Sequence, residues 1–350
     1  MATKKFLSFL IEQEIQEYGL NLDILTEQFN ILAEPKTQVS PKWPVVRAAI
    51  DRVFQELERK NKKALREKLK KANEMKSQSL FTKEGSNPKL SKSGKSVPEY
   101  YSIGLFLAPS TLSGIDVCPC ATDECRAACL GSAAGRARMD SVRDARVVRT
   151  QFLFNHPEEF IIKLINEIQK EKEKAEKEGK KLAVRLNGTS DLPWEYIAPK
   201  LFDYFPDVTF YDYTKVAGRL HRKERPKNYH LTLSSTGINH PGSNWAECKK
   251  HLDNGGVVAM TFRPEDISKP IPKNFDLPEF VVDVKTGKKY RVIDGDKHDH
   301  RHLDKVLNDL NDNEGVIAGL RIKGGKGNAE TAGNFAVPIP TGKNEVIAKY

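Results

Sequence analysis

The chain has 350 residues and a formal net charge of +10 at pH 7, from 57 basic and 47 acidic side chains. Its hydrophobic content of 39% and charged content of 30% are typical of a soluble globular protein, and no apolar run is long enough to span a membrane. The N-terminal MATKKFLSFLIEQEI lacks the features of a signal peptide, because acidic residues interrupt its apolar run. We therefore expect a cytoplasmic protein without membrane contact, in a reducing compartment where clustered cysteines more often bind metals or act in catalysis than form disulfides.

Residues 1–75 carry apolar side chains at helical spacing and show no strand-like alternation, which predicts a helical N-terminal extension. Its last part, ERKNKKALREKLKKANEMK, is strongly basic, so this helix either has a solvated outer face or contacts the phosphates of a nucleic acid. The next segment, 76–98, is rich in Ser, Lys, Gly and Pro, which predicts a linker. We expect residues 99–350 to form an α/β domain that carries the clustered cysteines.

From Tyr101 onwards, short apolar runs alternate with helical stretches or long connections. The predicted strands are 102–109, 181–187, 207–213, 229–235, 255–262, 289–296 and 315–324. Buried strands in this alternation predict a parallel α/β sheet, which we expect to form a partial or full TIM-like barrel. No GxGxxG turn follows a strand, so a dinucleotide-binding Rossmann fold has no support.

Polar and charged side chains follow nearly every predicted strand. In parallel α/β folds, functional residues gather at the carboxyl ends of the strands. The residues that we predict to form a catalytic site there are Arg185, Asn187, Asp212, Lys215, Ser234, Arg263, Asp294 and Asp296. The cationic members of this set favour a small anionic or nucleotide-like ligand. The last two carboxylates precede KHDHRHLD, so they also fit a divalent-metal hydrolase or nuclease, although a polar turn explains the same residues.

Four of the five cysteines lie within DVCPCATDECRAACLGSAAG, residues 116–135, directly after the first predicted strand. Their spacing lacks the C-x-x-C of a redox dithiol, and no second knuckle completes a structural zinc site. Closely spaced thiolates among small residues better fit an iron–sulfur cluster of the 4Fe–4S type, with zinc as the alternative. The ligand set is either Cys118, Cys125 and Cys129, or Cys120, Cys125 and Cys129. Cys248 is either a distant fourth ligand or an ordinary buried thiol.

Several arginines follow the cysteines along a predicted helix. They are Arg136, Arg138, Arg143, Arg146 and Arg149. Arginines in this position either neutralise a cluster, grip phosphate groups, or form salt bridges with Asp140 and Asp144.

Taken together, these motifs resemble a known family. The cysteine loop CP…C…CL, the AR…RT helix and the strand motifs VRLNGTSD, FYDYTK, NYHLTLS, VIDGD and GLRIKG resemble the gene-product-88 family of bacteriophages and mobile plasmids, over about residues 98–338. The resemblance implies a phage or plasmid origin, hence the host cytoplasm, and it matches Cys118, Cys125 and Cys129 to the family's cysteines, while Cys120 departs from the pattern. It implies no established activity.

A more distant analogy links the cysteine loop after the first strand to the barrels of radical S-adenosylmethionine enzymes. Their C-x3-C-x2-C signature is absent here, because position 132 is Ser.

The leading hypothesis is an iron–sulfur protein that acts as a redox or Lewis-acid enzyme on a small anionic or nucleotide-like substrate at the barrel mouth. One alternative is a nucleic-acid-binding protein with a structural metal, in which the basic helices 59–71 and 136–149 contact phosphates. The other is the divalent-metal hydrolase or nuclease.

Overall fold

The computed structural model describes residues 43–74, 79–129, 131, 137, 139–222 and 225–349; the helices predicted before residue 43 lie outside this range. The helices are α3 (Trp43–Glu58), α4 (Lys62–Glu74), α5 (Pro88–Ser96), α6 (Asp123–Ala127), α7 (Asp140–Asn155), α8 (Pro157–Lys177), α9 (Trp194–Ile197), α10 (Pro199–Tyr204), α11 (Trp245–Asp253), α12 (Asp304–Leu307) and α13 (Gly325–Thr331). The described residues also form three short 3-10 helices, η2 (Glu84–Ser86), η4 (Ala217–His221) and η5 (Arg301–Leu303).

The strands form one eleven-stranded, mostly parallel sheet. They are β1 (Phe81–Lys83), β2 (Tyr100–Leu105), β3 (Lys181–Arg185), β4 (Thr209–Thr214), β5 (Tyr229–Ser234), β6 (Val257–Pro264), β7 (Phe280–Asp283), β8 (Lys289–Asp294), β9 (Val316–Arg321), β10 (Val337–Ile339) and β11 (Glu345–Ala348). The order is β1-β2-β3-β4-β5-β6-β9-β8-β7-β11, with β10 on β6, and only the β1–β2 and β7–β8 pairs are antiparallel. The parallel α/β prediction is confirmed, and all seven predicted strands are present.

The prediction of a linker over 76–98 is wrong from residue 79 onwards, where the chain forms a strand and two helices. β1 pairs with β2, and α5 follows it with Pro88 in its first turn and the Asn87 side chain accepting hydrogen bonds from the Lys89 and Leu90 amides. Leu80, Phe81 and Leu90 are buried in spite of the polar composition around them. A few apolar side chains are therefore enough to fix a segment that its average composition assigns to a linker.

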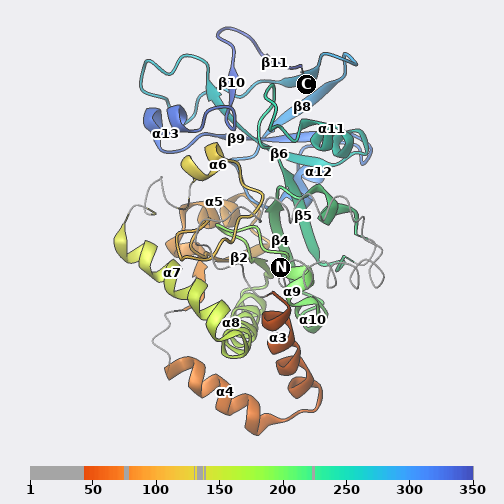
Figure 1. Cartoon of the computed structure of the whole chain (residues 1–350). Helices are drawn as coiled ribbons and strands as arrows, with labels where there is room; N and C mark the ends of the chain where they lie inside the picture. Colours follow the sequence, from red (N-terminus) through yellow and green to blue (C-terminus); the bar gives the residue numbers. More distant parts are fainter. Residues whose placement is uncertain are drawn as a thin grey trace, which may run out of the picture.

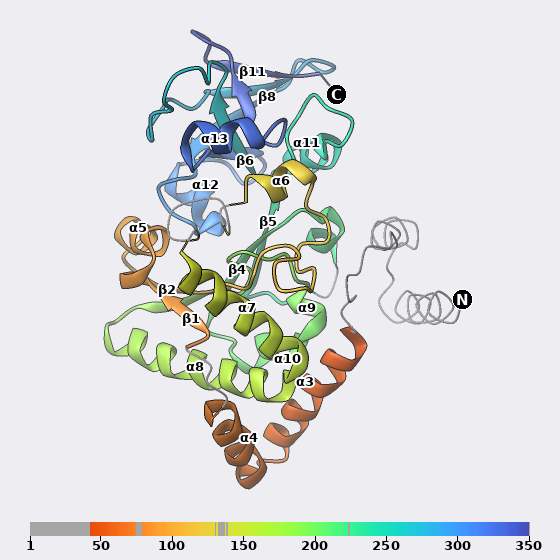
Figure 2. The same ribbon diagram turned by 60° about the vertical axis from the view of Figure 1, so that its left-hand side comes forward.

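One face of the sheet is covered by helices. Helix α8 lies along the β1–β2–β3 part of the sheet, and α3 and α4 pack on the outer side of α8, at the end of the molecule away from β10 and β11 (Figures 1 and 2). The apolar side chains of α3 follow helical spacing, and Val46, Ile50 and Val53 are buried in the main core. The helices at the start of the described chain are therefore part of the same hydrophobic core as the sheet.

The opposite face of β2, β3 and β4 packs against the polar connection 295–304 between β8 and α12. His300 Nε2 lies 3.2 Å from Ser102 Oγ of β2, and Tyr100 and Tyr211 pack against the His300 ring. The Ser96 hydroxyl at the end of α5 donates to the Lys297 carbonyl. A connection that leaves the sheet at β8 thus returns to strands on its far side.

Candidate functional site

The cysteine loop has a defined shape in the part that the structure describes. The Asp191 amide donates to the carbonyl of Val117, a fully buried residue. The Arg126 guanidinium pairs with Asp116 at 3.1 Å and donates to the Cys118 carbonyl at 3.0 Å. These contacts fold the loop back on itself, at the carboxyl end of β2.

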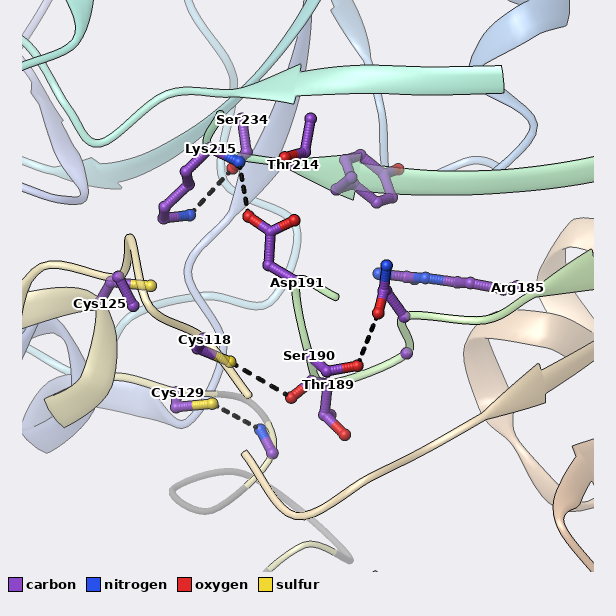
Figure 3. A pocket seen from close by; sticks show the side chains of 15 residues that line it. Cys118, Cys125, Cys129, Arg185, Thr189, Ser190, Asp191, Thr214, Lys215 and Ser234 are labelled. Carbon is purple, nitrogen blue, oxygen red and sulfur yellow. Dashed lines mark hydrogen bonds between the residues drawn. The ribbon is translucent and has the colours of Figure 1, made fainter. Parts of the chain in front are cut away.

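Three of the four loop cysteines line a single cavity of about 190 Å³. Cys118, Cys125 and Cys129 share it with residues at the carboxyl ends of β3, β4 and β5 and in the connections after β3 and β4. Figure 3 shows these cysteine side chains on one wall and those of Asp191, Lys215 and Arg185 on the facing walls. All five cysteines have free thiols.

The other two cysteines lie elsewhere. Cys120 does not line the cavity, and Cys248 is fully buried in α11 within the core, as expected of an ordinary buried thiol. Of the two triads that the spacing leaves open, the structure brings together Cys118, Cys125 and Cys129.

Backbone N–H groups and a cation surround the three sulfurs. The Ser110 amide points at Cys118 Sγ at 3.5 Å, and the Gly131 amide points at Cys129 Sγ at 3.3 Å. The Lys215 ammonium donates to Ser234 Oγ at 3.2 Å and lies in the same cavity as the Cys125 thiol, with which its charge interacts favourably when the thiol is ionised. Burial raises the pKa of the Cys118 thiol to about 12, so this thiol stays protonated at neutral pH unless a cation replaces its proton.

Among the residues that the structure describes, no three or more His, Cys, Asp or Glu side chains form a group that could hold a metal ion. The cavity nonetheless gathers three thiols beside the carboxylate of Asp191, with N–H groups aimed at two of the sulfurs.

Arg185 enters the cavity from the end of β3, and a buried carboxylate holds it there. Its Nη1 lies 2.7 Å from Asp299 Oδ2, and its guanidinium stacks over Tyr213, whose hydroxyl donates to Asp299 Oδ1 at 2.7 Å. Lys89 of α5 approaches the same carboxylate at 3.0 Å. Burial alone would raise the pKa of Asp299, but Lys89 and Arg185 lower it well below its usual range. Asp299 was not among the predicted site residues.

Asn187 and Asp212 shape the loop after β3. The Asn187 side chain donates to the Leu192 carbonyl at 2.8 Å and accepts from the Ser190 hydroxyl at 2.8 Å. Asp212 is buried, does not line the cavity, and accepts from the Asn187 amide at 2.7 Å and the Tyr229 hydroxyl at 2.9 Å. Burial raises the pKa of Asp212 to about 7. These contacts give the loop its shape and leave Asp212 without access to a ligand in the cavity.

Asp191 and Arg219 position Lys215. The Lys215 amide donates to Asp191 Oδ2 at 2.8 Å, and Arg219 Nη1 lies 2.6 Å from Asp191 Oδ1. Arg219 also pairs through Nε and Nη2 with both oxygens of Glu195, at 2.7 and 2.8 Å. Sequence reasoning missed Arg219, because no motif marks it and its partners lie on a different connection.

Besides Asp212, three other predicted site residues do not line the cavity. Arg263 donates to the neighbouring Pro264 carbonyl at 3.1 Å. Asp294 and Asp296 both pair with Arg321, at 2.9 and 3.2 Å, and Asp296 also pairs with Lys323. The cavity therefore brings together Arg185, Asn187, Lys215 and Ser234 with the thiols. The catalytic roles of Asp212, Arg263, Asp294 and Asp296, which do not line it, remain predictions.

All three described arginines of helix α7 contact other residues of the chain. Arg143 pairs with Asp140 and Asp144, and Arg146 and Arg149 donate to the carbonyls of Gly131 and Ser79. Arg136 and Arg138 lie outside the described residues. Arg143 therefore forms the predicted salt bridges, whereas Arg146 and Arg149 hydrogen-bond to backbone carbonyls.

Of the three histidines of the connection 295–304, His298 and His300 are buried and His302 is half-buried, and all three favour the neutral form. Burial lowers the pKa of His298 to about 3, of His300 to about 4 and of His302 to about 3. In the unfolded chain these groups titrate at about 6.5. The unfolded state therefore binds more protons between pH 6.5 and about 4, so this contribution to stability is present above pH 6.5 and lost as the pH falls.

We expect His300→Gln, which cannot take up that proton, to flatten the pH dependence of the unfolding free energy between pH 7 and pH 4.5. Urea unfolding at several pH values measures it, with His221→Gln at an exposed histidine as the matched control. Asp212 and Asp304, whose pKa values burial raises to about 7, act in the opposite direction, but they are common to all three proteins. Identical pH slopes for the wild type and His300→Gln would show that this histidine is not held neutral.

Comparison of the sequence with known protein families identifies one match. The sequence model of one family, gene product 88, matches residues 55–336. The chain belongs to the gene-product-88 family. The resemblance predicted from the motifs is confirmed, and the match begins earlier than predicted, so it includes α4 and the end of α3.

Beyond this gene-product-88 match, no curated protein and no solved structure matches the chain. The analogy to radical S-adenosylmethionine barrels therefore gains no support. Within the described residues, none of the helices of this family member combines the length and the apolar character that crossing a membrane requires.

Proposed function

We propose that Cys118, Cys125 and Cys129 hold an iron–sulfur cluster, and that the protein is a redox or Lewis-acid enzyme for a small anionic or nucleotide-like substrate. The observation that carries this proposal is that three thiols and the side chains of Lys215 and Arg185 line the same cavity. The host cytoplasm, where thiols stay reduced, suits such a site.

The residues around the cavity fit a cluster. Thiolates are the usual protein ligands of iron–sulfur clusters, and each binds a different iron atom, so thiols placed around a cavity need not meet at one point as the ligands of a zinc ion must. N–H groups aimed at the sulfurs, such as those of Ser110 and Gly131, tune such a site. When bound, the cluster would supply electron transfer or a Lewis-acidic iron.

The other walls of the cavity supply the groups for an anion. Lys215 and Arg185 bring positive charge, and Ser234 and Ser190 bring hydroxyls that donate or accept hydrogen bonds. The carboxylate of Asp191 also lines the cavity, and Arg219, which Asp191 shares with Glu195, offsets part of its charge. A small ligand with a carboxylate or phosphate group therefore finds charge and hydrogen-bond partners beside the thiols.

The position of the cavity agrees with a partial barrel, which remains part of the proposal. The connection after β8 reaches Arg185 at the end of β3, on the other side of the sheet order. Such a contact across the inner face is what a strongly curved sheet requires, with the cavity at its carboxyl-end mouth.

Purification without oxygen tests the proposal. We expect a brown protein with a broad visible absorption band that bleaches on exposure to air or to a strong reductant. A colourless protein that contains stoichiometric zinc would contradict the iron–sulfur assignment and support the alternative metal.

A further inference from the structure

Helix α4 has an inner face that packs against the protein and an outer face that is basic. Leu65, Leu69 and Ala72 lie at helical spacing and pack into the main core. On the same side, Lys68 pairs with Glu158 and Lys71 pairs with Glu159, both at the start of α8. The inner face of α4 therefore packs its apolar side chains into the core, and two of its lysines form ion pairs with α8.

The outer face keeps its charges. Lys62, Lys63 and Arg66 are exposed, and together with Lys60 in the preceding turn they make no ion pair with any residue that the structure describes. Lys62 and Arg66 are one helical turn apart, and Lys63 and Arg66 are nearly so, so the three side chains point to the same side. These four residues are called the α4 basic face below.

Acidic side chains close to this face are already engaged. Glu56 of α3 contacts Arg59 and accepts from the Asn61 side chain, and Glu58 pairs with Lys200. Among the side chains of α4 that the structure describes, Glu67 is the one exposed acid without an ion pair. The α4 basic face therefore keeps a local excess of about three positive charges, at the end of the molecule where α4 projects beyond α8 (Figure 2).

We propose that the α4 basic face binds the phosphate backbone of double-stranded nucleic acid, independently of sequence. The argument is charge complementarity on an exposed helix: a helix is about 10–12 Å across, and the major groove of B-DNA is about 12 Å wide. The outer face offers no large apolar side chain to insert into a bilayer, because the leucines of α4 point inward. This proposal does not depend on the cluster.

Binding of a fluorescein-labelled 20-base-pair DNA duplex to the full chain, followed by fluorescence anisotropy, tests the proposal. Four phosphate contacts predict that the logarithm of the binding constant falls with the logarithm of the salt concentration, with a slope of about −3.6. Affinity should then drop about 150-fold between 50 and 200 mM salt.

A triple variant locates the contact. Lys62→Gln, Lys63→Gln and Arg66→Gln together remove three contacts, keep helix propensity and leave the buried leucines in place, so the salt slope should fall by about 3. The matched control removes three exposed lysines from the β7 and β11 end of the molecule, Lys273→Gln, Lys285→Gln and Lys343→Gln, and its slope should stay that of the wild type.

Three results would overturn the proposal. They are no duplex binding at 50 mM salt, an equal loss in both triple variants, or binding to vesicles that contain anionic phospholipid with none to the duplex. The second result would mean that only net charge matters, and the third would assign the face to a membrane.

Discussion

Replacing Cys118, Cys125 or Cys129 with serine is expected to remove the visible absorption of the anaerobically purified protein. Each of these thiols lines the cavity. Loss of a thiolate ligand should weaken cluster binding by more than about 100-fold, since even the outer contacts of a metal site are worth about 10- to 100-fold. Visible spectra and iron content of the three variants, purified side by side with the wild type, measure the effect.

Two matched controls lie in the same chain. Cys120→Ser changes a cysteine of the same loop that does not line the cavity, and Cys248→Ser changes a buried thiol in α11. Both variants should keep the absorption of the wild type. Loss of absorption in Cys120→Ser with retention in Cys118→Ser would select the other triad, Cys120, Cys125 and Cys129, and exclude Cys118 as a ligand.

Replacing Arg219 with leucine is expected to lower the free energy of unfolding by about 3–5 kcal/mol. Arg219 is buried and pairs with Glu195, whose side chain is 2% exposed, and with Asp191. Without the guanidinium, both carboxylates stay in a region of low dielectric without their counter-charge. Urea unfolding of the wild type and the variant at neutral pH measures the loss.

Arg143→Leu is the matched control, because Arg143 lies on α7 with its side chain half exposed, and its ion-pair partners in the described part of the chain are the exposed Asp140 and Asp144. Its effect should stay within about 0.5 kcal/mol. Adding Glu195→Leu to Arg219→Leu should recover part of the lost stability, since it removes the orphaned charge. Equal, small effects in both single variants would show that the Arg219 network does not hold the site loops in place.

The sequence predicts the central strands well, because they are continuous apolar runs between polar connections, and burial on both faces of a parallel sheet requires such runs. β1, β7, β10 and β11 escape prediction because they have only three or four residues each. Their pairing partners, and not their own sequence, make them strands. The same holds for α5, where the buried Leu90 is hidden within a polar segment.

Part of the candidate site could be predicted from position alone. The polar side chains at and beyond the carboxyl ends of β3, β4 and β5 line one cavity because these strands are neighbours in the sheet. The loop after β2 brings the three thiols to the same cavity. The rule that the strand ends form one site does not hold for Asp294 and Asp296, which do not line the cavity. β8 is three strands from β5 in the sheet order, about 14 Å at the usual strand spacing.

The residues that hold the site in place could not be predicted from the sequence. Asp299 and Arg185 are 114 residues apart, and only the return of the connection after β8 brings them together. Arg219 is similar, since its two carboxylate partners follow β3, whereas Arg219 itself follows β4. Such ion pairs depend on tertiary contacts that leave no periodic pattern in the sequence.

Iron, acid-labile sulfide and zinc, measured per chain in protein purified without oxygen, test the central claim most directly. A cluster held by Cys118, Cys125 and Cys129 predicts iron and sulfide in equal amounts, both lost in Cys125→Ser, with little zinc. Stoichiometric zinc without sulfide, or iron and sulfide retained in Cys125→Ser, would contradict it.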